Sequence, residues 1–175
     1  MRTSLLPGTD LELSAIGMGC WAIGKTYWGD DVEDATSVEA VHAALDVGIN
    51  WFDTAPLYGE GHADEVLREA LSGCSEQPVI ASKVGVMFQG TSGHAESKLD
   101  EAHLRADVEA SLTRLKREAI DLLQVHWPCQ HGTTLEETFT TLQALKAEGK
   151  VRHIGVCNYG PADLDELMSY ADVVS

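Results

Sequence analysis

The chain alternates regularly between short apolar runs and longer amphipathic stretches, and this pattern leaves few folds open. The apolar runs are Ala15–Trp21, Ile49–Thr54, Pro78–Val84, Ile120–His126, Val151–Cys157 and Ala171–Val174. Several of them carry β-branched residues on both faces of the pleat, which is typical of parallel strands buried on both sides. Alternation of strand and helix implies right-handed crossovers and a parallel sheet.

The stretches between these runs have the apolar spacing of helices. Apolar residues recur every three or four positions, which places them on one helical face. The two clearest faces are Leu104, Val108, Leu112 and Leu115, and Val38, Val41, His42 and Leu45. Helix ends are marked by C-terminal glycines, a capping box and a proline in a first turn. These markers are Gly48, Gly73 and Gly149, Thr134 with Glu137, and Gly160-Pro161.

The first residues differ from this repeat. Leu5–Leu13 indicates a β-hairpin around Pro7-Gly8, and such a hairpin could close the bottom of a barrel. The longest non-periodic stretches, Gly24–Asp31 and Val86–Ser97, follow the first and third strands. They are therefore expected on the C-terminal face, where barrel enzymes keep their chemistry.

The number of strand–helix units predicts an α/β fold of the (β/α)8 TIM-barrel type that is incomplete. A full barrel takes about 250 residues, whereas the 175 residues here supply about five and a half units. In this interpretation residues 1–175 form a single domain equivalent to the N-terminal part of a barrel. We expect either that the chain is a fragment or that something else covers its open strand edges.

The net charge of the chain limits the kinds of molecule that it can bind. The chain has 12 basic and 28 acidic residues, a net charge of −16, so its surface repels nucleic-acid phosphates and anionic lipids. No apolar run reaches the ~20 residues of a membrane span, and the first residues lack a signal-peptide core. The four scattered cysteines suit a reducing compartment. We predict a cytoplasmic protein with no nucleic-acid or membrane partner, and the sequence leaves the oligomeric state open.

Chemically useful side chains follow several of the predicted strands. Asp53 ends the second strand, and Tyr58 lies in the loop after it; Lys83 ends the third strand and His126 the fourth. Each has an ordinary structural interpretation when taken alone, as a helix cap, a loop or core residue or a solvated charge. The C-terminal ends of barrel strands meet at one rim, however, so we expect these groups to converge.

Together these groups would form an acid for carbonyl chemistry. An unperturbed tyrosine has a pKa of about 10, and a neighbouring lysine ammonium is expected to lower the pKa of Tyr58. Asp53 would keep the ammonium of Lys83 charged and oriented, and His126 could hydrogen-bond a carbonyl oxygen. Such a set protonates an oxygen that becomes an alkoxide, as reduction by a cofactor's hydride requires.

The sequence also resembles a known family. Asn50–His62, with Asp53 and Tyr58 five residues apart, is similar to the signature of the aldo-keto reductases. Further segments match that family's motifs in the family's order, namely Gly17–Gly24, Ala81–Gly85, Asp121–Pro128 and Gly149–Asn158. Together the matches cover nearly the whole chain.

The resemblance implies an NADP-dependent oxidoreductase that reduces small aldehydes or ketones, with Tyr58 as the proton donor. The catalytic set that it implies is Asp53, Tyr58, Lys83 and His126. The implied nicotinamide contacts are Gly19, Cys20, Trp21, Asp53, Cys157 and Asn158, of which Asn158 would hold the carboxamide. Trp28 and Trp127 are candidates for the substrate wall, with simple packing as the alternative. The implied cofactor is NADP(H), and no metal site is implied.

Three features depart from the family's pattern. Cys157 stands where the family commonly has serine, and a thiol is a weaker hydrogen-bond partner than a hydroxyl. Ala63-Asp64-Glu65 replaces a more usual serine–glutamate pair. The family grips the adenosine and phosphates mainly with later loops, and these have no counterpart in the 175 residues. A glycine-rich G-x-G-x-x-G phosphate loop after a strand is also missing from the sequence.

Two other functions stay open on sequence grounds. The first is a non-catalytic fragment, or a regulatory subunit of the same fold, that binds the cofactor weakly. The second is a metal-dependent barrel hydrolase, because His126, Cys129 and His131 are close in sequence and Asp53 shares their rim. Catalytic zinc needs three ligands that meet at one point, and the first strand ends in Cys20-Trp21 rather than the His-x-His usual in such hydrolases.

Overall fold

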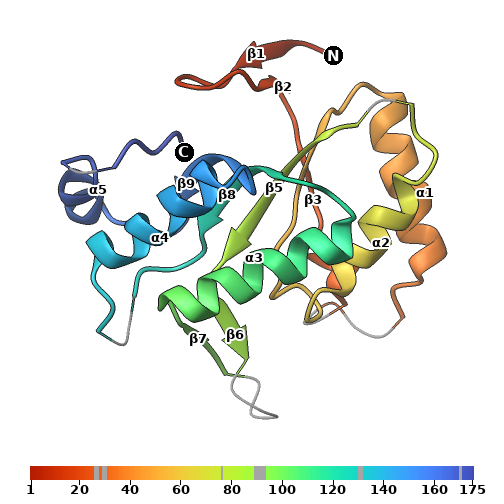
Figure 1. Cartoon of the computed structure of the whole chain (residues 1–175). Helices are drawn as coiled ribbons and strands as arrows, with labels where there is room; N and C mark the ends of the chain where they lie inside the picture. The colour runs from red at the N-terminus through yellow and green to blue at the C-terminus, as the bar shows by residue number, and fades with distance from the viewer. Residues whose placement is uncertain (26–27, 29–30, 76, 89–93, 130–131, 170) are drawn as a thin grey trace.

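A five-stranded parallel sheet forms the centre of the computed structural model, which describes all residues except 26–27, 29–30, 76, 89–93, 130–131 and 170. Its strands lie side by side in chain order, and a crossover joins each strand to the next (Figure 1). They are β3 (Met18–Gly19), β4 (Trp51–Asp53), β5 (Val79–Val84), β8 (Ile120–Val125) and β9 (Val151–Val156). This order is the one that the strand–helix alternation predicts, although β3 is much shorter than its apolar run.

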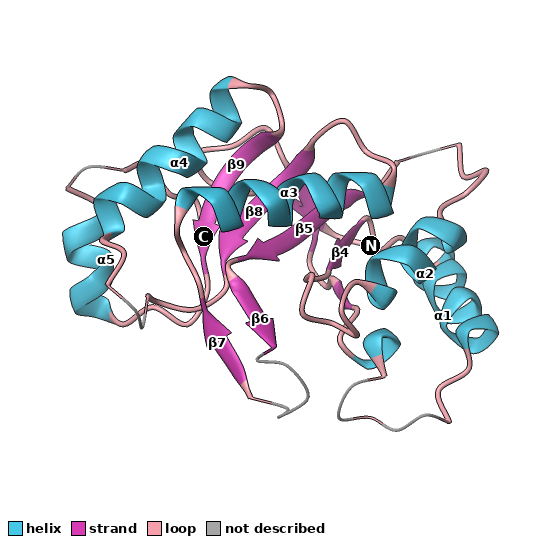
Figure 2. Cartoon of the chain, turned by 60° about the horizontal axis from the view of Figure 1, so that its bottom comes forward, coloured by secondary structure: helices cyan, strands magenta, loops and turns pink. Residues whose placement is uncertain are grey.

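Helices connect the strands and cover the outer face of the sheet (Figures 1 and 2). They are η1 (Ala22–Gly24), α1 (Asp34–Asp46), α2 (His62–Ala70), α3 (Glu101–Leu115), α4 (Leu135–Ala147) and α5 (Pro161–Leu167). The predicted helix signals are confirmed. Glycines with φ of 86°, 85° and 79° follow α1, α2 and α4, the Thr134–Glu137 capping box is present, and proline opens α5.

The two faces of the sheet have different partners. On the outer face, Phe52, Ile80 and Leu123 are buried among the helices. On the inner face, the register places Asp53 level with Ala81 and Ala81 level with Leu122. Residues in register point to the same side of a sheet. Asp53, Ala81 and Leu122 therefore lie on the side that forms the interior of a barrel.

The predicted N-terminal hairpin closes one end of that interior. Strands β1 (Thr3–Leu5) and β2 (Glu12–Ser14) pair antiparallel, and Leu11 between them packs against Ala81 and Leu122 on the inner face. Side-chain contacts fix the hairpin to the sheet, since the backbone N–H of Ser14 donates to Asn50 Oδ1 (2.8 Å). The hairpin therefore covers the N-terminal ends of the strands.

A second hairpin, which the sequence pattern did not predict, extends from the opposite end. Strands β6 (Val86–Phe88) and β7 (Ala95–Ser97) pair antiparallel within the stretch expected to be irregular. Figure 1 shows β6–β7 and β1–β2 at opposite ends of the sheet. The β6–β7 hairpin follows β5, so it lies on the C-terminal face together with the candidate catalytic residues.

The predicted sixth strand, Ala171–Val174, is wrong as a strand. The segment is irregular, and only two backbone hydrogen bonds join the chain end to β9: Val174 N–H to Ile154 O (3.0 Å) and Val156 N–H to Ser175 O (2.8 Å). Within the segment the donor is Val174 and the acceptor is the next residue, Ser175, so the two bonds do not form a regular parallel ladder. The fold is an incomplete (β/α)8 barrel with five strands in its sheet.

Within the described ranges, no helix is long and apolar enough to cross a membrane.

Candidate active site

Adjacent strands bring the first two candidate residues together. Asp53 is the last residue of β4, and Lys83 lies on β5 two positions beyond Ala81, the partner of Asp53 in the register. Both side chains therefore point to the inner face near the C-terminal end of the sheet. The Lys83 side chain is only 5% exposed, whereas Asp53 is 29% exposed, so the lysine is held within the site and the aspartate borders open space.

The ammonium of Lys83 makes three hydrogen bonds. Its Nζ donates to Asp53 Oδ1 (2.5 Å), to the backbone oxygen of Thr54 (3.2 Å) and to the hydroxyl oxygen of Tyr58 (3.1 Å). An ammonium has three N–H donors, so all of them are used. The orientation of the Lys83 ammonium is thus fixed by three acceptors from β4 and the loop after it.

Tyr58 and His126 face each other at this rim. Their ring centroids are 6.1 Å apart at an interplanar angle of 83°, and His126 follows directly after β8. The ring of Trp21 also stacks on the phenol ring, with centroids 6.3 Å apart. The structure therefore brings Asp53, Tyr58, Lys83 and His126 into one cluster.

Burial changes the expected acidity of Tyr58. Desolvation raises the pKa of Tyr58 above its ordinary value and outweighs the opposing influence of Lys83, so the predicted lowering is wrong in its net direction. Burial lowers the pKa of Lys83, but Asp53 and Tyr58 outweigh that effect and the pKa ends above its usual value. At neutral pH the phenol therefore carries its proton and the lysine is charged.

His126 is neutral at the same pH. Burial, assisted by the nearby charge of Lys83, lowers the pKa of His126 to about 4. A neutral imidazole can hydrogen-bond an oxygen without adding a charge to the site. The arrangement thus combines one charged group that orients, one protonated phenol and one neutral polar ring.

We expect the low pKa of His126 to make the protein less stable in acid. In the unfolded chain an ordinary histidine has a pKa of about 6.5, so between pH 6.5 and 4 the unfolded state binds more protons and stability falls as the pH falls. Between pH 7 and 4.5 the wild type should lose about 2 kcal/mol more unfolding free energy than His126→Gln. Urea unfolding at both values measures this, and parallel losses in the two proteins would contradict it.

A cavity of about 300 Å³ opens beside the cluster. It is lined by Trp21, Leu57, Tyr58, Phe88, Ala95, His126, Trp127 and Asn158. Five of these were candidates from sequence: Tyr58, His126, Trp21 and Asn158 for catalysis or cofactor binding, and Trp127 for the substrate wall. Sequence reasoning missed the other three: Leu57 in the loop before Tyr58, and also Phe88 and Ala95, because the β6–β7 hairpin carries them. Two short runs that flank a Gly- and Ser-rich sequence were the available signal.

The first strand end contributes backbone and an aromatic ring. Gly19 is level with Asp53, and an added Cβ there would meet no atom within 4 Å, so open space lies over it. Cys20 is fully buried in the core, main chain included, so it is not exposed at the rim beside Gly19 and Trp21. Trp21 is 48% exposed and presents its ring to the cavity.

The fifth strand end and the two tryptophan candidates complete the rim. Asn158 adopts a left-handed conformation with φ of 63°, and its Nδ2 donates to His126 O (2.9 Å) and to Cys157 Sγ (3.1 Å). Trp127 packs beside His126, with ring centroids 5.6 Å apart. Trp28 lies further out, where it meets the edge of Trp21 at 6.1 Å and is 56% exposed.

Two backbones touch directly behind Tyr58. A Cβ added to Gly24 would lie 2.5 Å from the carbonyl carbon of Tyr58 and 2.7 Å from the nitrogen of Gly59. A Cβ on Gly59 would lie 2.4 Å from Gly24 O. Only residues without side chains allow η1 to pack this closely on the turn, which fixes the position of Tyr58 relative to Trp21.

The residues of the alternative metal site do not form a cluster in the described part of the chain. There, no group of three or more His, Cys, Asp or Glu residues is placed to hold a metal ion. His131 lies outside the described residues. His126 instead faces Tyr58, as given above.

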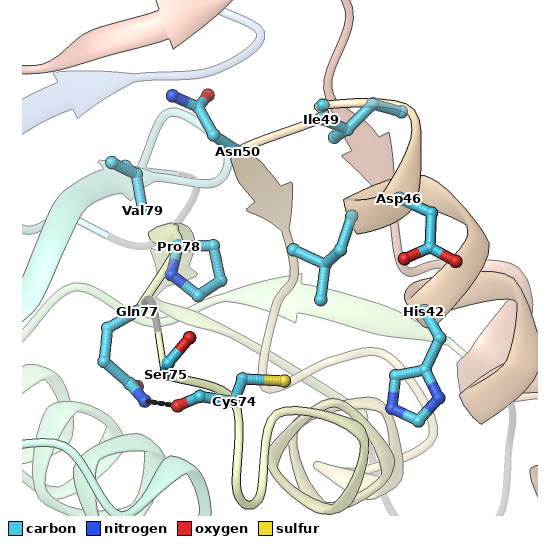
Figure 3. A pocket seen from close by; sticks show the side chains of 11 residues that line it. His42, Asp46, Ile49, Asn50, Cys74, Ser75, Gln77, Pro78 and Val79 are labelled. Atoms are coloured by element: carbon cyan, nitrogen blue, oxygen red, sulfur yellow. Dashed lines mark hydrogen bonds between the residues drawn. The ribbon is translucent and has the colours of Figure 1, made fainter.

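A larger cavity, about 760 Å³, has none of the candidate catalytic residues in its lining (Figure 3). His42 and Asp46 from α1 line one side, and Cys74 and Gln77 from the segment before β5 line the other; the side-chain amide of Gln77 donates to Cys74 O (3.4 Å). The cavity is at the N-terminal ends of β4 and β5. Barrel enzymes work at the opposite, C-terminal face, so we place the candidate active site at the smaller cavity.

Comparison with known proteins identifies the family. The family model described as Aldo/keto reductase family matches residues 15–175. The chain belongs to the aldo-keto reductase family. An aldo-keto reductase from Bacillus subtilis (strain 168) is 37% identical over 173 residues, which are 98% of this chain and 51% of that protein. The NADH-specific methylglyoxal reductase of Escherichia coli (strain K12) is 32% identical over 99% of this chain and 57% of its own length.

Solved structures of aldo-keto reductases have the same fold. The glycerol dehydrogenase from Gluconobacter oxydans superimposes with a TM-score of 0.88 and 39% identity, over 98% of this chain and 53% of that one. The chain thus spans about half the length of the relatives that it matches.

The rim residues fit the nicotinamide part of an aldo-keto reductase cofactor. Trp21 and Asn158 line the same cavity, and open space lies over Gly19. An aromatic ring and a side-chain amide suit a planar ring that carries a carboxamide.

Proposed function

We propose that this chain carries the catalytic part of an oxidoreductase that reduces aldehydes or ketones with NADPH, with Tyr58 as the proton donor. The observation that supports this most directly is the Lys83 ammonium, which hydrogen-bonds both Asp53 (2.5 Å) and the hydroxyl of Tyr58 (3.1 Å). The phenol borders a cavity large enough for a small carbonyl compound.

In this proposal the side chains transfer a single proton and stabilise the charge that its transfer creates. The nicotinamide, when bound, supplies the hydride for the carbonyl carbon. Tyr58 gives its proton to the carbonyl oxygen, which completes the alcohol and leaves a phenolate. The charge of Lys83 stabilises that phenolate, and Asp53 keeps Lys83 charged. His126, neutral and across from the phenol, hydrogen-bonds the same oxygen and orients it, and solvent returns the proton to Tyr58.

The residues proposed to hold the cofactor are those of the rim. Asn158 would bind the carboxamide, and Trp21 and the backbone of Gly19 would contact the nicotinamide ring. The resemblance implies Cys20 as a further contact, although Cys20 is buried in this structure. We also assign Asp53 and Cys157 to the cofactor site, as the resemblance implies. For the choice between the two cofactors we propose NADPH, as the resemblance implies, although the Escherichia coli relative is named as NADH-specific. Measurement of both cofactors decides this point.

We expect the chain to bind the nicotinamide end of the cofactor. Reduced nicotinamide mononucleotide contains only that end, so its fluorescence should change on titration with the chain. Asn158→Ala should weaken the affinity measured in this titration about tenfold, as the loss of one good hydrogen bond does. Parallel titrations with NADPH and NADH give the preference. No response to any of the three, even at millimolar concentration, would favour the alternative of a non-catalytic fragment or regulatory subunit.

The proposal also includes the cellular compartment of the protein and its binding partners. We propose that the protein works in the cytoplasm on a small-molecule carbonyl substrate and has neither nucleic acid nor membrane as a partner. The net charge of −16 and the four cysteines, all present as free thiols, support this. Fractionation of cells that express the protein, followed by immunodetection, tests the compartment.

A further inference from the structure

A buried carboxylate outside the four-residue cluster requires an explanation. Asp64, on α2, is 0% exposed. Its Oδ1 accepts a hydrogen bond from the hydroxyl of Thr54 (2.8 Å), and its Oδ2 accepts one from Arg114 Nε (3.1 Å). Burying a charge is unfavourable unless the charge is paired and hydrogen-bonded. The burial of Asp64 is thus tolerated because of these two partners, and both lead to the segment that carries Tyr58.

The first partner leads to the start of that segment. Thr54 donates its hydroxyl proton to Asp64, and its backbone oxygen is the third acceptor of the Lys83 ammonium (3.2 Å). All three N–H donors of Lys83 are used, so the position of this oxygen helps to set the direction of the other two bonds. A displacement of Thr54 would therefore turn the ammonium relative to the hydroxyl of Tyr58.

The second partner leads to the end of the segment. Gly61 has a φ of 95°, and a Cβ there would lie 2.4 Å from Arg114 Nε, so the guanidinium packs directly on the backbone of Gly61. The same guanidinium donates from Nη2 to Ser111 Oγ (3.1 Å), which fixes it to α3. The Asp64–Arg114 pair thus contacts both Thr54 and Gly61, the two ends of the segment.

We propose that Asp64 and Arg114 are positioning residues that hold residues 54–61 by both ends and so aim the Lys83 ammonium at the hydroxyl of Tyr58. This inference rests on the proposed role of Tyr58 as the proton donor. Neither residue touches the substrate cavity in this assignment: Asp64 acts through Thr54, and Arg114 acts through Asp64 and the backbone of Gly61.

Two substitutions at Thr54 test the proposal as a matched pair. Thr54→Val keeps the shape of the side chain and removes the hydroxyl, whereas Thr54→Ser keeps the hydroxyl and removes the methyl group. In a chain extended through the remaining barrel units, Thr54→Val should lower kcat for aldehyde reduction about tenfold with KM little changed, as loss of an effect confined to the transition state does. Thr54→Ser should stay within about twofold of wild type.

A spectroscopic readout separates positioning from simple stability and from the proposed function. The ¹³Cζ resonance of Tyr58, assigned by its absence in Tyr58→Phe, reports the hydrogen bond to the phenol in the 175-residue chain. It should move in Thr54→Val and keep its wild-type position in Thr54→Ser. An unmoved resonance and unchanged kcat in folded Thr54→Val would overturn the proposal.

Two further outcomes are also decisive. If the wild-type extended barrel does not reduce aldehydes, the proposed function fails, and the resonance alone still decides whether Asp64 and Arg114 position Lys83. If Thr54→Val does not fold, Arg114→Lys replaces it, because lysine keeps the charge but loses the planar fork that joins Asp64 to Ser111. The Tyr58 resonance should then move in Arg114→Lys, and an unmoved resonance would refute the inference.

Discussion

Replacing Tyr58 with phenylalanine is expected to lower turnover about a thousandfold, within the 10²–10⁴ range for loss of a general acid. The change removes one oxygen, which accepts a hydrogen bond from Lys83 Nζ (3.1 Å) and supplies the proton in the proposed reaction. The phenyl ring can still stack on Trp21, so cofactor affinity should change little. Turnover of an aldehyde with NADPH is measured in a chain extended through the remaining barrel units.

A second tyrosine near the rim provides the control for this result. Tyr159→Phe is the matched control, because Tyr159 is next to Asn158 in sequence but does not line the cavity. Its turnover should equal that of the wild type. Tyr58→Phe with wild-type turnover would end the assignment of Tyr58 as the proton donor, and an equal loss in both variants would point to the fold instead.

Replacing Gly24 with alanine is expected to lower turnover about a hundredfold by displacing Tyr58. The new Cβ would lie 2.5 Å from the carbonyl carbon of Tyr58, and since both contacting groups are backbone, η1 and the turn must move apart. A displacement of about 1 Å in a catalytic group can cost about a hundredfold in rate. Overpacking should also lower the unfolding free energy by about 1–3 kcal/mol. Turnover and urea unfolding measure the two effects.

Gly160→Ala provides the matched control for this change. At Gly160 the nearest atom to an added Cβ is 3.5 Å away, and φ is −80°, a value that alanine adopts without strain. Its turnover should stay near wild type, and its unfolding free energy should fall by less than about 1 kcal/mol, because Gly160 is the N-cap of α5. If Gly24→Ala behaves in the same way, the backbone contact between η1 and the turn does not position Tyr58.

The sequence predicted the parts of the fold that depend on local patterns. Apolar spacing located α1 and α3, and glycines with positive φ stood where the helices were expected to end. It failed where the decisive contacts are not local. The run Ala171–Val174 has the composition of a strand, but strand formation depends on a regular ladder with β9, which the segment does not make. The β6–β7 hairpin is only two three-residue strands, too short for a period to show.

The candidate site shows the same limit. The convergence of Asp53, Tyr58, Lys83 and His126 could be predicted, because all four lie at or shortly after the C-terminal ends of strands, and these ends meet at one rim. The direction of the Tyr58 pKa could not, because it depends on how completely the folded rim removes the phenol from water. The Asp64 contacts were also beyond sequence reasoning: Thr54 is 10 residues from Asp64, and Arg114 is 50 residues away on another helix.

The three acceptors around the Lys83 ammonium have a consequence for how the site assembles. Asp53, Thr54 and Tyr58 lie 30, 29 and 25 residues before Lys83, so a single strand–helix–strand crossover contains the lysine and all of its partners. The entropic cost of closing a loop grows only with the logarithm of its length, and this crossover is a local connection between two neighbouring parallel strands. The charge and the phenol can therefore meet as soon as β4 and β5 have paired, before the last strand of the sheet has joined it.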